Sequence, residues 1–144
     1  VRGPPGSGKS SYVREHAGPN DVVICLDTII MTLTKLPEHH STPWALPKAL
    51  EIRNAKLRKL ASDTQHDRAW FIISAPNPRD IAVWKARLGG EIVVLATPLS
   101  ECVRRIKADP ARAGLTDRMI EVATSWWARN PHLRAQQYHT EMCG

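Results

Sequence analysis

A glycine-rich run near the amino terminus has the residue types and spacing of a phosphate-binding loop. Residues 3–10, with the sequence GPPGSGKS, match the pattern G-x-x-x-x-G-K-[ST] at each fixed position. Glycines let backbone amides approach phosphate oxygens that a side chain would keep away. The amides at the start of the helix that follows add partial positive charge. The run therefore predicts binding of a nucleoside triphosphate, with ATP and Mg²⁺ as the implied ligands.

We expect both side chains and backbone groups of this loop to bind the nucleotide. Lys9 would place one positive charge on the outer phosphates, and the Ser10 hydroxyl would be an oxygen ligand of Mg²⁺. We expect the remaining positions to surround the phosphates with their backbone; these are Gly3, Pro4, Pro5, Gly6, Ser7 and Gly8.

A carboxylate follows the first apolar run after the loop. Asp27 comes directly after residues 21–26, DVVICL, whose β-branched composition predicts a buried strand. In a parallel sheet, the carboxyl end of this strand lies at the same edge as the phosphate loop. Asp27 could there accept the proton of an attacking hydroxyl or bind Mg²⁺ through water. The alternative is that Asp27 caps the short helix that follows, and the two roles are compatible.

The next apolar run argues against two classes of P-loop protein. Residues 69–74, AWFIIS, continue into Ser74-Ala75-Pro76-Asn77, and the first carboxylate after them is Asp80. A motor-type ATPase would have an acidic magnesium ligand at the end of this strand. The sequence also lacks the N-K-x-D motif that reads guanine, which argues against a GTPase.

A basic segment surrounds residues 109–111 and has the composition of a lid over a triphosphate. Its cations are Arg104, Arg105, Lys107 and Arg112. Guanidinium groups at such a position neutralise charge on the transferred phosphoryl group. We favour Arg105 and Arg112 as the phosphate-binding pair. The alternative is a solvated helix face followed by a turn.

The elements that must position these residues alternate between strands and helices, which predicts an α/β fold. We expect a central parallel sheet with helices on both faces, the three-layer architecture of P-loop kinases. The expected strands are 21–26, 69–74 and 91–96, and the expected helices are 8–17, 28–33, 44–64, 79–88, 99–108 and 117–129. One kinase domain would span 1–129, followed by a tail, 130–144, without firm structure. Only two residues precede the loop, where a strand is usual, so we expect a trimmed amino terminus.

The charge of the chain is compatible with a polyanionic partner. Twenty Lys and Arg against 14 Asp and Glu give a formal net charge of +6 in 144 residues. A basic helix stretch contains Arg53, Lys56, Arg58 and Lys59, which could steer a nucleic acid backbone. The alternative is a scattered, solvated set of cations.

Other residues give weaker signals. We interpret His39 and His40 as solvated loop histidines, and Trp126 and Trp127 as one core anchor beside one partly exposed ring, with base stacking as the alternative. Three cysteines without metal-ligand spacing indicate reduced thiols and a cytoplasmic protein. No apolar run is long enough to span a membrane.

With these residues in view, the chain resembles the kinase domain of bacteriophage polynucleotide 5′-hydroxyl kinase and its small phage and prophage P-loop relatives. The resemblance covers about residues 1–129 and rests on three segments, GPPGSGKSSYVREH, WFIISAPNPRD and ECVRRIKADPARAG. It implies that Asp27 is the general base and that Arg105 and Arg112 bind phosphate. Two positions depart from the family pattern: Leu26 replaces the usual arginine before the aspartate, and Ala75 replaces an aspartate in a Ser-Asp-Thr-Asn run.

The residues and the resemblance together predict a magnesium-dependent ATP kinase. The favoured acceptor is a hydroxyl of DNA or RNA, either the 5′-end or a hydroxymethylated base. The alternatives are a kinase acting on a nucleoside, nucleotide or other small molecule, and a nucleotide-binding module that does not transfer phosphate.

Overall fold

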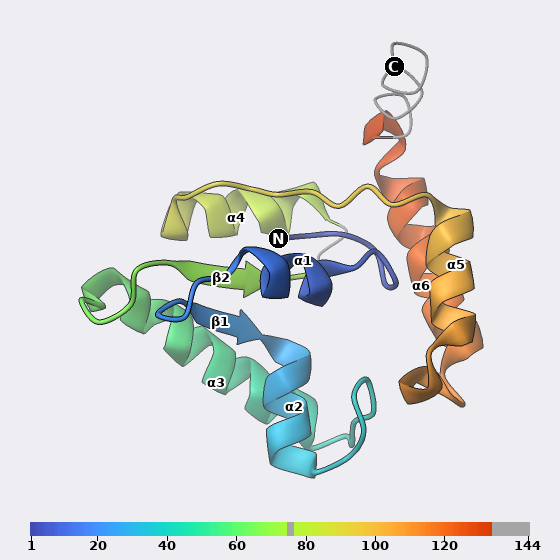
Figure 1. The fold of residues 1–144 in the computed structure, drawn as a ribbon, viewed down its shortest axis with the longest axis horizontal. Helices are drawn as coiled ribbons and strands as arrows, with labels where there is room; N and C mark the ends of the chain where they lie inside the picture. Colours follow the sequence, from blue (N-terminus) through green and yellow to red (C-terminus); the bar gives the residue numbers. More distant parts are fainter. Residues whose placement is uncertain (75–76, 134–144) are drawn as a thin grey trace. The chain divides into compact units, whose positions relative to one another are not determined.

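A computed structural model of the chain describes residues 1–74 and 77–133, and it has the expected α/β P-loop fold (Figure 1). The chain forms two compact units. The first unit contains Val1 and Ser10–Ile73, and the second contains Arg2–Lys9 and the chain from Ser74 onward.

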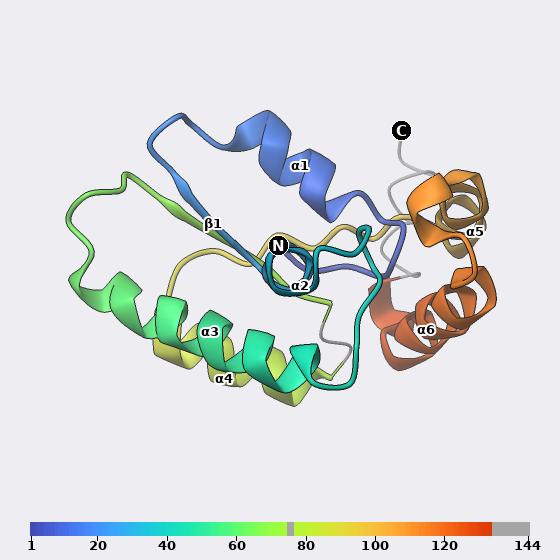
Figure 2. The same ribbon diagram turned by 90° about the horizontal axis from the view of Figure 1, so that it is seen from below.

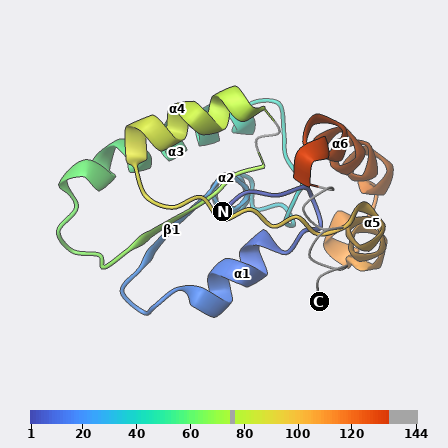
Figure 3. The same cartoon turned by 90° about the horizontal axis from the view of Figure 1, so that it is seen from above.

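The first unit is built on two parallel strands, β1 (Val22–Cys25) and β2 (Ala69–Ile72). Val22 lies opposite Ala69 and Cys25 opposite Ile72. Helix α1 (Lys9–His16) lies on one face of this pair, and α3 (Ala45–Lys59) lies on the other (Figures 2 and 3). Because neighbouring side chains of a strand point to opposite faces, β1 packs against both layers at once. The expected layering of helices on both faces of a parallel sheet is therefore present in this unit.

Helix α2 (Leu26–Thr34) begins directly where β1 ends. Its buried side chains Ile29 and Ile30 pack against Ala45 and Ala49 of α3, which are fully buried. The small alanines allow the two helices to approach closely. The helix ends at Thr34, and the capping residue Lys35, with a left-handed backbone at φ 58°, turns the chain into the loop before α3.

Helix α3 is shorter than expected. The sequence predicts a helix over 44–64, but α3 ends at Lys59 and continues as a 3₁₀ turn, Leu60–Ser62. The Asp63 carboxylate accepts hydrogen bonds from the backbone amides of Gln65 and His66, at 2.8 and 3.1 Å. This local turn competes with continued helix and explains the early end.

The backbone of Val1 pairs with the β2 segment of the first unit. Its amino group donates to the Phe71 carbonyl at 2.7 Å, and its carbonyl accepts from the Ile73 amide at 3.0 Å. Val1 therefore pairs as a strand residue would, which is the structure expected just before a phosphate loop.

The described part of the second unit includes the helices α4 (Pro78–Leu88), α5 (Leu99–Ala108) and α6 (Thr116–Arg129). A 3₁₀ turn, Pro110–Arg112, lies between α5 and α6, which pack side by side. Helix α4 has a clear start: the Asn77 side chain accepts from the Arg79 amide, and a proline follows at the first helical position.

Both tryptophans of α6 belong to the core of the second unit. Trp126 and Trp127 are each 1% exposed and pack edge to face, so the expectation of one partly exposed ring is wrong. The Trp127 indole donates to the Thr97 carbonyl at 3.2 Å, and the Arg2 guanidinium lies 5.5 Å from the centre of the Trp126 ring. These contacts occupy the ring surfaces of the two tryptophans, so neither ring is available for stacking on a base.

The expected strand 91–96 is reduced to a single bridge between Val94 and Arg2. The Arg2 amide donates to the Val93 carbonyl, and the Arg2 carbonyl accepts from the Leu95 amide, both at 2.9 Å. The next residues on the Arg2 side are Gly3-Pro4-Pro5, and prolines have no amide hydrogen to continue a ladder. The apolar pattern of residues 91–96 correctly predicted an extended backbone. How many of these residues pair as a strand depends on the segment around Arg2, which the pattern does not contain.

The chain remains packed beyond α6. Asn130 is fully buried: its side-chain carbonyl accepts from Arg2 at 2.7 Å, and its amide donates to the Trp126 carbonyl at 2.8 Å. Leu133 joins the tryptophan core. The proposed boundary at residue 129 stays a prediction, and residues 134–144 lie outside the described part. None of the described helices has the length and apolar content needed to cross a membrane.

Candidate functional site

The phosphate loop depends on glycines with left-handed backbone. Gly6 has φ 78° and Gly8 has φ 93°, both in the region that other residues rarely adopt. A Cβ atom on Gly6 would lie 2.7 Å from the Cys102 carbonyl oxygen, which is too close for any side chain. A Cβ atom on Gly8 would lie 3.2 Å from Nη1 of Arg105. The loop therefore packs tightly on α5, and a side chain at Gly8 would fill the space beside an arginine.

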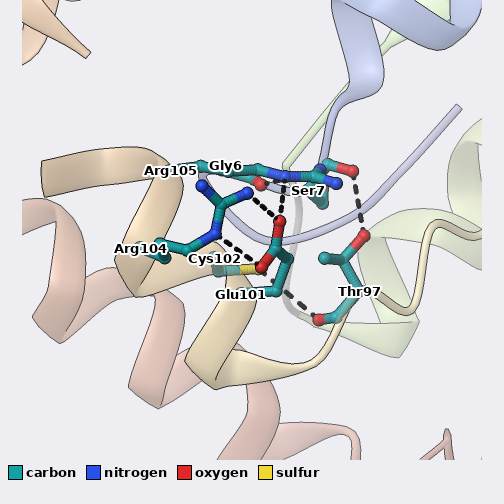
Figure 4. A network of polar contacts seen from close by, with 7 residues as sticks. All are labelled: Gly6, Ser7, Thr97, Glu101, Cys102, Arg104 and Arg105. Carbon is teal, nitrogen blue, oxygen red and sulfur yellow. Dashed lines mark hydrogen bonds and ion pairs between the residues drawn. The ribbon is translucent and has the colours of Figure 1, made fainter. Parts of the chain in front are cut away.

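Two further hydrogen bonds hold the backbone of the loop. The Ser7 amide donates to the Pro4 carbonyl at 3.1 Å, which closes the turn. The Thr97 hydroxyl donates to the Ser7 carbonyl at 2.9 Å, as Figure 4 shows. Gly3 sits so close to Ser7 that a Cβ atom there would lie 2.6 Å from the serine Oγ. The loop is thus preorganised by its own unit.

The Lys9 ammonium lies across the loop. Its Nζ donates to the carbonyls of Gly3 and Pro4, each at 2.9 Å. Lys9 is also the first residue of α1, where backbone amides have no intrahelical partner and favour anions. A phosphate in this loop would meet both the ammonium and the positive end of the helix.

Arg105 reaches the same loop from α5. Its Nη1 donates to the Gly6 carbonyl at 3.4 Å, and its Nε donates to Glu101 Oε1 at 3.0 Å (Figure 4). The sequence predicts Arg105, and not Arg104, as a phosphate-binding residue. Among the described residues, the Arg104 guanidinium donates to Glu101, with 2.8 Å between its Nε and Oε2.

The Cys102 thiol lies beneath the phosphate loop. It is fully buried under the loop, and burial raises the pKa of the thiol. The charges of Lys9, Arg105 and Arg112 act in the opposite direction and lower this pKa. The three predicted phosphate-binding cations of the second unit therefore all act on one atom.

Arg112 is bound to its own turn. Its Nε donates to Asp109 Oδ2 at 3.0 Å, and its Nη1 lies 3.2 Å from the sulfur of Met119. The other Asp109 oxygen accepts from the Ala111 amide at 2.9 Å and so fixes the start of the 3₁₀ turn. Arg112 is thus held by contacts within the turn and α6, whereas Arg105 directly contacts the loop.

Asp27 occupies the first turn of α2 in the first unit. The residue at the cap position is Cys25, so the capping alternative for Asp27 is wrong. The Asp27 side chain is half exposed, which leaves the carboxylate accessible to a substrate. The start of a helix also favours its negative charge.

His39 lies beside Asp27, which the sequence did not predict. Its side chain is only 12% exposed, and Nδ1 lies 3.7 Å from Oδ2 of Asp27, so the interpretation as a solvated histidine is wrong for this residue. The left-handed backbone of His39, φ 71°, directs the loop back toward α2. Its Nε2 also lies 3.7 Å from Glu38. Only the path of the loop between α2 and α3 brings this pair together, and no local pattern encodes that path.

The residues present fit a nucleotide with magnesium. A Cβ atom on Gly8 would approach Nη1 of Arg105, and Ser10 and Asp27 carry hard oxygen atoms of the kind that Mg²⁺ selects. Within residues 1–74 and 77–133, no three His, Cys, Asp or Glu side chains form a metal cage. Mg²⁺ in nucleotide sites takes most of its ligands from phosphate and water, so such a cage is not required.

The basic stretch of α3 divides into two parts. Arg53 packs over the Phe71 ring, 5.7 Å from its centre, and burial lowers the pKa of its guanidinium. Lys56, Arg58 and Lys59 are exposed in the last turn of the helix. These three residues, and not Arg53, form the exposed basic patch of α3.

Comparison with known proteins identifies the family of the chain. No curated protein matches the chain. A family match covers residues 1–141 and is to AAA_33, described as an AAA domain. This is a kinase-like group of P-loop proteins that includes polynucleotide kinase-type and other kinases. The chain therefore belongs to the AAA_33 family of P-loop, nucleotide-binding, kinase-like proteins.

Proposed function

We propose that the protein is an ATP-dependent kinase that transfers the γ-phosphate to a hydroxyl of a nucleic acid, either a 5′-end or a hydroxymethylated base. The observation that carries the proposal is the convergence of Lys9 and Arg105 on one preorganised phosphate loop. Two cations at one loop suit a triphosphate whose charge must be neutralised during transfer. Membership of a kinase-like family supports the same reaction class.

The donor half of the proposed site uses residues of the loop and of α5. The loop amides and Lys9 bind the phosphates, and Arg105 exchanges its long bond to the Gly6 carbonyl for a phosphate oxygen. Arg112 would join them when the triphosphate is bound. Ser10 and Asp27 would hold Mg²⁺, which supplies further neutralisation of phosphate charge.

The acceptor half uses Asp27. Its accessible carboxylate accepts the proton of the acceptor hydroxyl as the oxygen attacks the γ-phosphorus in line with the departing ADP. Most of the rate enhancement comes from holding the two substrates in this alignment.

The choice of a nucleic acid rests on charge. The chain carries a net charge of +6, and Lys56, Arg58 and Lys59 form an exposed basic patch on α3. A patch of this kind attracts a polyanion by release of its counterions, whereas a nucleoside gains little from it. The buried thiols Cys25 and Cys102 suit the reducing cytoplasm of a bacterium or a phage-infected cell.

The test is transfer from labelled ATP across a panel of acceptors: 5′-hydroxyl DNA, 5′-hydroxyl RNA, hydroxymethylated DNA and free nucleosides. We expect label on an oligonucleotide, and none with the Lys9→Ala variant, which lacks the loop ammonium. Label on free nucleosides alone would identify a small-molecule kinase. ATP binding without transfer to any acceptor would identify a nucleotide-binding module.

A further inference from the structure

The Glu101 carboxylate connects two arginines of α5 with the phosphate loop. Its Oε1 accepts from Arg105 Nε at 3.0 Å, and its Oε2 accepts from Arg104 Nε at 2.8 Å (Figure 4). These bonds, with that of Arg104 first, lower the pKa of Glu101 to about 2. The carboxylate is therefore ionised at neutral pH.

The contacts of Arg105 are unequal in strength. The bond from Nε to Glu101 is charge-assisted and of normal length. The bond from Nη1 to the Gly6 carbonyl is 3.4 Å long, near the limit for a hydrogen bond to a neutral acceptor. Glu101 thus fixes one edge of the guanidinium, while the other edge rests weakly at the loop and can exchange its acceptor.

The space beside that weakly bonded edge is part of the loop itself. Nη1 of Arg105 lies 3.2 Å from the place of a Cβ atom on Gly8, and Gly8 directly precedes Lys9. An anion in the loop would therefore lie beside Nη1. The guanidinium is planar, so holding its Nε edge also sets the direction of its terminal nitrogens.

We propose that Glu101 is a positioning residue that holds Arg105 at the mouth of the phosphate loop, ready to contact the donor phosphates. The proposal rests on the proposed function, because it takes ATP as the ligand of the loop. Glu101 itself touches no phosphate. It lowers the cost of ordering a long, flexible side chain when ATP binds.

A simple charge effect predicts the opposite result. Glu101 is a negative charge close to a triphosphate site, and repulsion alone would make its removal strengthen ATP binding. Positioning through Arg105 instead predicts that its removal weakens ATP binding, and only when Arg105 is present. The two explanations therefore differ in sign and in dependence on Arg105.

The test is a double-mutant cycle on Glu101 and Arg105, read out as the Kd for Mg·ATP by calorimetry. We expect Glu101→Ala to weaken binding by about threefold to tenfold, the range for losing one charge-assisted contact at a partly exposed site. In the Arg105→Ala background, the same change should alter Kd by less than about twofold, the usual error of additivity. Glu101→Gln keeps an acceptor oxygen and should restore part of the affinity.

Two controls complete the design. Arg118→Ala removes an exposed cation from α6, outside the predicted lid, and should leave Kd close to that of the wild type. Thermal unfolding of each variant shows whether α5 is intact. Partial rescue by Glu101→Gln, with unchanged unfolding, separates positioning from a structural role.

The outcomes distinguish this inference from the proposed function. Tighter ATP binding by Glu101→Ala, or an equal loss with and without Arg105, overturns the positioning role and leaves the kinase assignment untouched. A wild-type protein that does not bind Mg·ATP overturns both.

Discussion

His39 faces Asp27 across the start of α2, with 3.7 Å between the imidazole Nδ1 and the carboxylate Oδ2. The histidine is largely buried, whereas the aspartate is half exposed. The carboxylate thus has an imidazole close to one side and remains accessible to a substrate.

The His39 contact predicts a selective effect on transfer. His39→Ala should lower the phosphoryl-transfer rate by about threefold to tenfold, the range for losing one partly exposed electrostatic contact. The Kd for ATP should not change, because the loop and Lys9 are intact. Single-turnover kinetics and ATP titration give the two quantities. His40→Ala, in the same loop, is the matched control, and an equal effect of both variants would mean that only the loop is disturbed.

Asp27→Asn tests the proton acceptor. The amide keeps the size of the side chain but cannot accept the proton, so transfer should fall by about two to four orders of magnitude. ATP affinity should change much less. The measurement is the transfer rate at saturating ATP, with Asp80→Asn in the first turn of α4 as a control for carboxylate removal. A similar loss of ATP affinity and rate would point to a metal or structural role for Asp27.

Gly8→Ala separates backbone strain from phosphate binding. A methyl group at φ 93° costs about 1–2 kcal/mol in free energy of unfolding and also lies 3.2 Å from Arg105. Gly89, at φ 65°, has no atom within 4 Å of its added Cβ, so Gly89→Ala carries strain without filling a site. We expect both variants to unfold at lower denaturant concentration. Only Gly8→Ala should also lose ATP affinity, by about tenfold or more. If this variant binds ATP as tightly as the wild type, Gly8 is not part of the phosphate site.

Some features of the fold and of the candidate site could be predicted from local sequence patterns, and others could not. The bounds of α5 and the start of α1 were predictable, because each depends on spacing and composition within a few residues. The extent of pairing at Val94 was not, because it depends on Arg2, far away in the chain. The approach of His39 to Asp27 was likewise not predictable, since it follows from a left-handed residue in a loop of irregular structure.

The tryptophan pair illustrates the same limit. Two adjacent aromatic residues on a helix ordinarily face different directions, which is why one exposed ring was expected. Both are buried because several segments converge on α6, including Val94, Ala96, Leu99 and Leu133. A helix enclosed on more than one side can bury neighbouring residues, and only the tertiary packing reveals that enclosure.

The exposed basic patch of α3 predicts a salt-dependent interaction with single-stranded nucleic acid. Each phosphate contact releases condensed counterions, so log K should fall linearly with log salt, with a slope of about −0.7 per contact on single strands. Replacing Lys56, Arg58 and Lys59 by glutamine should weaken binding and reduce the slope by about 2 if all three contact phosphates. Fluorescence anisotropy of a labelled oligonucleotide at several salt concentrations gives both values.

The matched control for the patch is Lys85→Gln, Arg87→Gln and Arg118→Gln, which removes the same charge from α4 and α6. Because net charge alone acts equally in the two triple variants, only a local contact can make the α3 variant weaker than the control. ATP binding by the preformed loop should respond little to salt in either variant. An equal loss of oligonucleotide affinity in both variants would assign the interaction to net charge. Binding that does not depend on salt concentration or oligonucleotide length would favour a small-molecule acceptor.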